Sequence, residues 1–223
     1  MLVSMLTAKR RQEEKEQRRK LIVDAAQELF FSKQYEEITI ETIAKKAQLA
    51  KGTIYLYFDS KEALYSAVAL RGLRILNSMF KKAVIGKKNG LEKAFSIGEA
   101  YYDFCRQHKS YFLMSIESEH LPGTIKGEIN SKELVSINGE NLEILRKAVA
   151  EGIEDGSVKP NLNPLLTSVF LIQSTKAMIE LPSGFESLLK RSGSEKDEVL
   201  KFTLQALRHS LQNIQSKNKV DKK

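Results

Sequence analysis

Apolar residues near the start of the chain recur at helical spacing. Between residues 18 and 32 they stand three or four positions apart, which places them on one face of a predicted helix. The residues of this face are Leu21, Ile22, Ala25, Ala26, Leu29 and Phe30. The pattern breaks at residues 33–35, so we expect the first helix to end there.

Two short helical segments follow this break. Thr39 is a suitable N-cap for the first, and Glu41 lies in its first turn, where the helix dipole favours a negative charge. The second comprises residues 50–58, in which Ile54 and Phe58 stand four apart and can share a buried face. Two short helices joined by a tight turn, with a helix before and after, predict a helix-turn-helix.

The remainder of the chain predicts further helices and contains no strand-like alternation or internal repeat. The expected helices begin at Lys61, behind the cap Asp59-Ser60, and then cover residues 91–107, 110–120, 132–155, 164–180 and 194–215, with a short turn at 185–190. The fold class is therefore all-α. We expect a DNA-binding head over residues 18–70 and a larger helical regulatory domain over residues 71–216.

Composition places the chain among soluble globular proteins. Apolar residues make up 42% and charged residues 29% of the 223 positions. The single cysteine, Cys105, excludes an internal disulfide framework, and no stretch reaches the ~18 apolar residues of a membrane span. The N-terminal residues lack the order of charge and apolarity of a signal peptide. We expect a cytoplasmic protein without a membrane partner.

The net charge of +8 indicates a polyanionic partner, and most of the excess lies at the two ends. Residues 9–20 hold seven basic and three acidic residues, and residues 217–223 hold four lysines and one aspartate. Either end can be a solvated tail. For residues 9–20 we favour a role in DNA binding, because the predicted helix-turn-helix follows directly. Residues 21–61 hold five basic and six acidic residues, so overall basicity does not locate a DNA-binding surface.

The side chains of the second short segment suit DNA. With Ile54 and Phe58 inward, five residues project outward: Lys51, Gly52, Thr53, Tyr55 and Tyr57. Lysine donates to guanine or phosphate, threonine contacts phosphate or a thymine methyl, and tyrosine hydroxyls donate to phosphate. Glycine permits close backbone approach. We predict that this segment is a recognition helix in the major groove.

Lys61 occupies an unusual position, in the first turn of its predicted helix, where the dipole disfavours a positive charge. A bound phosphate would resolve this conflict, since helix N-termini attract anions. The alternative is an exposed lysine that costs a few tenths of a kcal/mol. We favour a phosphate contact.

At these residues the sequence resembles the tetracycline-repressor-like (TetR) regulators, over about residues 20–68. The matching positions are Ile22, Val23, Asp24, Ala25, Ala26, Leu29, Phe30, Tyr35, Thr39, Ile40, Ile43, Ala44, Lys51, Gly52, Thr53, Ile54, Tyr55, Tyr57, Phe58, Ser60, Lys61, Glu62, Ala63 and Leu64. The resemblance implies a three-helix DNA-binding head. It also implies DNA-facing or phosphate-contacting positions, which are Thr39, Thr53, Tyr55, Tyr57 and Lys61.

Two positions depart from the family pattern. Gln48 stands where the turn usually holds a glycine, so we expect it to adopt a left-handed backbone conformation at a cost of order 1 kcal/mol. Ala50 stands where a serine or similar cap is common, which leaves the free amides there dependent on phosphate or water.

The regulatory half is expected to dimerise and to bind a small effector. The resemblance implies a homodimer interface built from residues 164–180 and 194–215, which are apolar over more than one face. Two core helices of a monomer are the alternative. The effector is expected to be apolar or aromatic, and its candidate pocket residues are Phe80, Tyr101, Tyr102, Phe104, Cys105, Tyr111, Phe112, Met114 and Met178. Plain core packing explains any one of them equally well.

Neither a metal site nor an active site is predicted. Cys105 and His108, and Glu117 and His120, stand three apart, which is a weak metal-ligand spacing. No nucleophile elbow, phosphate loop or dinucleotide fingerprint occurs, so we expect no enzyme and no cofactor. The leading hypothesis is a repressor that an effector releases from double-stranded operator DNA. An activator of the same fold, a helical adaptor without DNA binding and a metal-dependent enzyme are the alternatives.

Overall fold

The computed structural model describes residues 2–120 and 132–213, which form α-helices, one short 3-10 helix and no strand. The predicted all-α fold class is confirmed. The chain divides into two compact units. The first combines Met1–Leu73 with Ser110–Val135, and the second combines Arg74–Lys109 with Ser136–Lys223. Residues 110–120, which the sequence assigned to the regulatory half, thus lie in the same unit as the N-terminal head.

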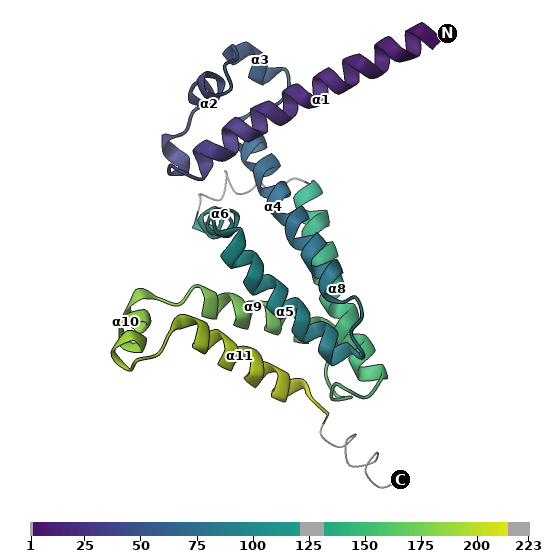
Figure 1. The fold of residues 1–223 in the computed structure, drawn as a ribbon, viewed down its shortest axis with the longest axis vertical. Helices are drawn as coiled ribbons and strands as arrows, with labels where there is room; N and C mark the ends of the chain where they lie inside the picture. Colours follow the sequence, from purple (N-terminus) through teal and green to yellow (C-terminus); the bar gives the residue numbers. More distant parts are fainter. Residues whose placement is uncertain (1, 121–131, 214–223) are drawn as a thin grey trace. The chain divides into compact units, whose positions relative to one another are not determined.

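The first unit contains the helix-turn-helix. Its elements are α1 (Leu2–Phe30), η1 (Tyr35–Glu37), α2 (Ile40–Lys46), α3 (Lys51–Tyr55), the first half of α4 (Lys61–Ala83) and α6 (Lys109–His120) (Figure 1). α2 packs against both α1 and α3. Ile22, Ile43, Ile54 and Leu64 are completely buried, which removes apolar area from water and holds the short helices in place.

α1 is much longer than the apolar pattern predicts, because it begins at Leu2 and not near residue 18. Residues 7–21 are all exposed, so no buried face holds this part of the helix. No proline or glycine interrupts it, and propagation from the packed half avoids the cost of nucleation. Side-chain pairs four residues apart also support it, including Arg10 with Glu14 at 2.9 Å.

The turn between α2 and α3 confirms the local predictions. Thr39 caps α2 and shares a capping box with Thr42. Gln48 has a φ of 55° and is the one non-glycine residue with positive φ in the part of the chain that the structure describes. Ala50 supplies no side-chain cap to α3. At the start of α4, the Ser60 hydroxyl accepts the Ala63 amide at 3.1 Å, as a cap should.

The second unit is a bundle of longer helices. It contains the second half of α4, α5 (Gly90–Gln107), most of α8 (Lys132–Glu154), α9 (Pro164–Ile179), α10 (Ser183–Arg191) and α11 (Lys196–Leu211). α5, α9 and α11 pack against one another. α10 is a regular helix where the sequence predicted a turn. α11 ends at Leu211, whose carbonyl accepts the Lys159 amide at 2.9 Å. Residues 214 and 215, expected at the end of this helix, lie outside the described residues.

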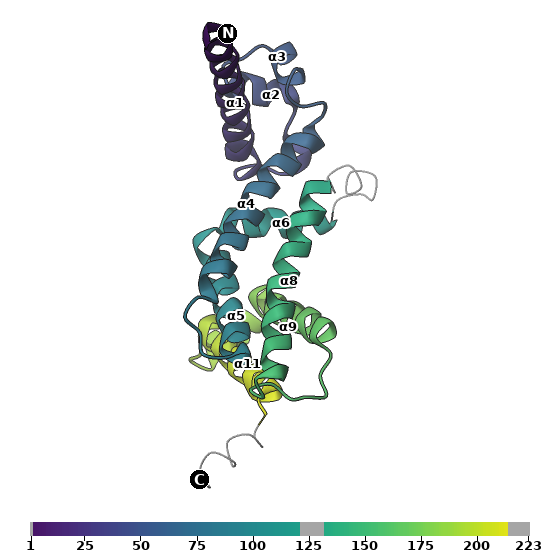
Figure 2. The ribbon, with the colours of Figure 1, turned by 90° about the vertical axis from the view of Figure 1, so that its right-hand side faces the viewer.

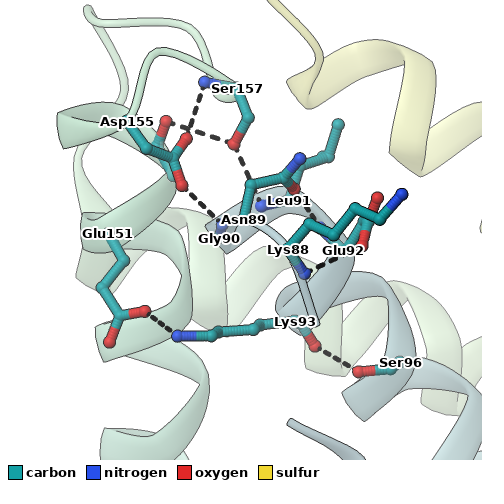
Figure 3. A network of polar contacts seen from close by, with 11 residues as sticks. Lys88, Asn89, Gly90, Leu91, Glu92, Lys93, Ser96, Glu151, Asp155 and Ser157 are labelled. Atoms are coloured by element: carbon teal, nitrogen blue, oxygen red, sulfur yellow. Dashed lines mark hydrogen bonds and ion pairs between the residues drawn. The ribbon is translucent and has the colours of Figure 1, made fainter. Parts of the chain in front are cut away.

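The start of α5 is tied to the end of α8 by a polar network (Figure 3). The Asp155 carboxylate accepts the Gly90 amide at 2.7 Å, and the Ser157 hydroxyl accepts the Leu91 amide at 3.2 Å. Partial burial opposes ionisation of Asp155, but hydrogen bonds from Ser157 and Gly90 outweigh it and lower its pKa. A Cβ on Gly90 would lie 2.0 Å from the Gly152 nitrogen, so glycine is required for this close approach.

Among the described residues, no helix is both long enough and apolar enough to cross a bilayer.

Candidate nucleic-acid interface

α3 and the residues after it present polar side chains above an apolar base. Ile54 is fully buried and Phe58 is 5% exposed, as predicted from their spacing. Lys51, Gly52 and Tyr55 are exposed, while Thr53 and Tyr57 are half-buried. The helix itself ends at Tyr55, before the end of the predicted segment 50–58, and Leu56 forms its C-cap. Tyr57 therefore projects from the turn that follows α3.

The tyrosine hydroxyls fall into two classes. Those of Tyr55 and Tyr57 have no hydrogen-bond partner among the residues that the structure describes. The other five tyrosine side chains have partners within their own unit: Tyr35 with Glu62, Tyr65 with the Met114 carbonyl, Tyr101 with Cys105, Tyr102 with Asp197 and Tyr111 with Gln27. Hydroxyls without internal partners remain available for phosphate oxygens.

Leu56 is a residue of this surface that sequence reasoning missed. Its side chain is 78% exposed, next to Tyr55. An exposed leucine alone is ordinary, but this one ends the recognition helix. Its apolar side chain suits a thymine methyl in the major groove. The only sequence signal for Leu56 was the spacing of Ile54 and Phe58, because a helix that buries these two residues exposes Leu56.

Lys61 does not extend freely into solvent. Its ammonium donates to the Tyr35 carbonyl at 2.9 Å and lies 3.8 Å from the centre of the Tyr35 ring. The ring face attracts the cation, and the carbonyl offsets the unfavourable helix dipole at the start of α4. This contact with Tyr35 therefore provides part of the stabilisation of the Lys61 charge that we predicted a bound phosphate would provide. A lysine ammonium has three donors, so Lys61 keeps capacity for a phosphate.

Tyr35 is the centre of a polar cluster that joins η1 to α4 and α6. Its hydroxyl donates to the Glu62 carboxylate, and its backbone amide donates to Glu117 of α6 at 3.3 Å. Partial burial raises the pKa of Glu62, but the hydrogen bond from Tyr35 and smaller interactions outweigh it, so the net pKa is lowered. Tyr65 donates to the Met114 carbonyl of α6 at 2.6 Å. α6 therefore supports the head directly.

The comparisons with known proteins agree with this geometry. The sequence profile described as "Bacterial regulatory proteins, tetR family" matches residues 22–68. The HTH-type transcriptional repressor DhaR of Mycobacterium sp. (strain GP1) is 24% identical over 209 residues, which cover 88% of this chain and 96% of DhaR.

Residues 22–68 form a DNA-binding domain of the tetR family of bacterial regulatory proteins.

Solved structures share this fold over most of the chain. FadR from Bacillus subtilis, crystallised in complex with stearoyl-CoA, has a TM-score of 0.68 at 20% identity and covers 85% of this chain and 97% of its own. PfmR, a TetR family regulator from Thermus thermophilus, has a TM-score of 0.59 at 18% identity over 82% of this chain and 91% of its own. The profile match and the similarity to DhaR make the chain a DNA-binding transcriptional regulator, with a helix-turn-helix head and a larger helical domain.

The candidate pocket residues are divided between the two units. Phe80, Tyr101, Tyr102, Phe104, Cys105 and Met178 lie in the second unit, whereas Tyr111, Phe112 and Met114 lie in the first. Tyr111 packs edge-on against Phe31, with ring centres 4.9 Å apart, and its hydroxyl donates to Gln27 at 2.8 Å. These contacts are with α1 and the residue that follows it, and the Tyr111 side chain also lies against Gly72 of α4. In the second unit, Phe80 and Tyr101 form an aromatic pair with centres 6.5 Å apart.

The weak metal-ligand spacings are not supported by their surroundings. Burial, the largest cause, raises the pKa of the Cys105 thiol to about 12, so it is protonated at neutral pH and a poor metal ligand. His108 caps the end of α5 and stacks beside Phe104. Glu117 is engaged by Tyr35, and the His120 side chain lies outside the described residues. The described part of the chain holds no group of three potential ligands.

A buried polar pair in the second unit had no sequence signal. Asn77 of α4 donates to the Asn141 side chain of α8 at 2.8 Å, and both residues are 6% exposed. The Nδ2 atom of Asn141 is buried and has no hydrogen-bond partner among the described residues. A buried amide donor without a partner costs about 1–3 kcal/mol, so this atom is a candidate polar contact for a ligand.

Proposed function

We propose that this regulator is a homodimeric repressor that leaves operator DNA when a small apolar or aromatic effector binds. Residues 18–70 are assigned to DNA binding and residues 71–216 to effector binding and dimerisation. The observation that carries the DNA-binding assignment is the pair of partner-free hydroxyls at Tyr55 and Tyr57, on a base anchored by Ile54. Both side chains reach the surface, so their hydroxyls can donate to the phosphate oxygens of operator DNA.

The contacts of the head divide by chemistry. Lys51 and Gly52 at the start of α3 enter the major groove, where Lys51 donates to guanine or phosphate. Thr53 contacts a base edge or phosphate, and Tyr55 and Tyr57 donate to phosphates. Thr39 is exposed at the N-cap of α2, and Lys61 contributes a phosphate contact from beside the Tyr35 ring.

The dimer is assigned to α9 and α11 because α9 has an inverted pattern of burial. Its buried residues are the polar Thr167, Ser168 and Thr175. Its exposed side chains are large and apolar, with Leu166 at 68% and Phe170 at 54% exposure. An apolar face that its own unit leaves in water suits a second copy of the chain. Phe202 of α11, a helix that packs against α9, is also a large apolar side chain and is 71% exposed.

The effector is assigned to the second unit. FadR, which shares the fold, was solved in complex with stearoyl-CoA, a ligand with a long apolar chain. In this chain the aromatic residues around Phe80 and Tyr101 supply apolar contacts, and the unpartnered Asn141 amide supplies a polar one. Effector binding favours a conformation in which the two heads no longer match half-sites ~34–36 Å apart. We infer that no cofactor or metal takes part.

The decisive test is sequence-selective DNA binding. Fluorescence anisotropy is measured on the DNA upstream of the protein's own gene and on a shuffled duplex of equal length. The proposal predicts selective, salt-sensitive binding that Lys51→Gln weakens, while the matched change Lys87→Gln in the loop after α4 leaves it intact. Normal dimerisation without any selective binding would favour the adaptor hypothesis.

The effector assignment has its own test. Ligand that co-purifies with the protein is identified by mass spectrometry and added back to the DNA complex. Release from DNA by this ligand, with Asn141→Leu retaining DNA binding but losing the response, supports the assignment. Stronger DNA binding in its presence would instead favour the activator alternative.

A further inference from the structure

The exposed half of α1 carries a line of positive charge on one defined face. Arg11, Lys15 and Arg18 are separated by four and three residues, so they lie above one another on a helix. The same spacing continues to Ile22 and then to Ala26, both of which are completely buried against the head. The charged line is therefore the continuation of the face by which α1 packs on the helix-turn-helix.

Arg19 lies beside this line and shows which way the face is directed. Its guanidinium lies 4.9 Å from the centre of the Phe58 ring. Phe58 directly follows Tyr57, so the basic face begins next to the recognition surface. Figure 2 shows α1 alongside α2 and α3 within the first unit, and Figure 1 shows it running on past them. We call Arg11, Lys15, Arg18 and Arg19 the α1 basic stripe.

The acidic residues of α1 do not neutralise this stripe. Glu14 stands three residues after Arg11 and four before Arg18, but its carboxylate pairs with Arg10 at 2.9 Å. Glu13 pairs with Lys9 at 4.0 Å. Glu16 accepts a hydrogen bond from Gln12 at 2.8 Å. Within the described residues, Arg11, Lys15 and Arg18 take part in no ion pair. Several unpaired cations on one exposed face form a surface that suits a polyanion.

We propose that the α1 basic stripe binds the phosphate backbone of duplex DNA flanking the sequence read by α3. This inference rests on the proposed DNA-binding function and adds a second contact region to it. At a rise of ~1.5 Å per residue, the stripe from Arg11 to Arg19 is about 12 Å long. At ~3.4 Å per base pair this length corresponds to about four base pairs of flanking DNA. The contact is independent of sequence, because it is made to phosphates.

The test compares two triple variants with the same change in charge. The stripe variant is Arg11→Gln, Lys15→Gln and Arg18→Gln, and the control is Lys9→Gln, Arg10→Gln and Lys20→Gln on other faces of the same helix. Glutamine preserves helix propensity, and circular dichroism verifies that α1 remains folded. Binding is measured on a duplex that the parent protein selects from random sequences. The duplex is used with no flank and with about four extra base pairs on each side.

The parent and the control variant should bind the flanked duplex about tenfold more tightly than the short one, and the stripe variant should lose this gain. Its salt dependence should also flatten, by about one unit in slope for each phosphate that the variant no longer neutralises. Equal weakening in both triple variants, or unchanged binding by the stripe variant, would overturn the proposal. If the parent selects no sequence at all, it is the proposed DNA-binding function that fails.

Discussion

The recognition helix α3 and the helix α9 expose side chains of opposite chemistry. α3 buries Ile54 and exposes Lys51 and the hydroxyl of Tyr55, whereas α9 buries Ser168 and exposes Phe170. Both helices break the ordinary expectation for a surface helix. α3 leaves hydroxyls without partners, and α9 leaves large apolar side chains in water.

The difference indicates the partner that each helix meets. Unpaired donors and a cation suit a polyanion that supplies acceptor oxygens. An apolar face suits a protein surface of the same kind, and a second copy provides one by symmetry. Mutations in the two helices should therefore have separable effects. Changes on α3 should abolish DNA binding and leave the dimer intact, whereas changes on α9 should dissociate the dimer.

The largest effect is expected from a charge placed on the apolar face of α9. Phe170→Asp should dissociate the dimer and weaken operator binding by about 100-fold or more, since the two heads then bind independently. Analytical ultracentrifugation and fluorescence anisotropy measure the two effects. Ile85→Asp is the matched control, because Ile85 is 74% exposed in the loop after α4. If the Phe170→Asp protein remains dimeric, the dimer interface does not include this face of α9.

The next largest effect concerns the stability of the unit that carries α9. Gly90→Ala should destabilise it by about 3 kcal/mol, because the new Cβ meets the backbone of Gly152 and neither helix can yield without moving. Gly139→Ala in α8 is the control: nothing lies within 4 Å of its Cβ, so the change should be neutral or slightly stabilising. Urea denaturation measures both. Equal stability of the two variants would mean that α5 and α8 do not pack this closely.

A smaller effect is expected in the head, where Tyr35→Phe removes the hydrogen bond to Glu62. Because this bond helps to lower the pKa of Glu62 in the folded protein below its ordinary 4.5, the ionised carboxylate stabilises the fold above that pH. The stabilisation is lost as the pH falls through the folded pKa. The variant should be less stable by about 1 kcal/mol at pH 7, and the difference should shrink as the pH falls below 4.5. A pH-independent difference in denaturation midpoint would contradict this explanation.

The sequence predicted features that depend on neighbouring residues. The cap at Thr39 was predicted from local backbone chemistry. The left-handed Gln48 and the uncapped Ala50 were predicted from their departure from the family pattern. The extended start of α1 was not, since periodicity detects buried faces and residues 7–21 have none. A search for charged residues at helical spacing would have revealed the extended start of α1.

Contacts between distant segments had no comparable signal. The pairing of Asn77 with Asn141 and the contact of Tyr111 with Phe31 join residues far apart in the chain. Lys61 illustrates the same limit: its helix position was predicted, but its contact with Tyr35 depends on the path of the chain through η1. The aromatic residues proposed as one pocket were grouped by nearness in sequence, and the structure divides them between two units.

The central claim is that the unpartnered hydroxyls of the recognition surface bind operator phosphate. The most direct measurement is the operator affinity of the double variant Tyr55→Phe, Tyr57→Phe, with Tyr102→Phe as a control outside the head. Each change removes one oxygen atom and leaves the ring in place. The double variant should bind about tenfold or more weakly, at about 1 kcal/mol for each missing bond, with an unchanged melting temperature and dimer. Affinity equal to that of the parent protein would contradict the claim.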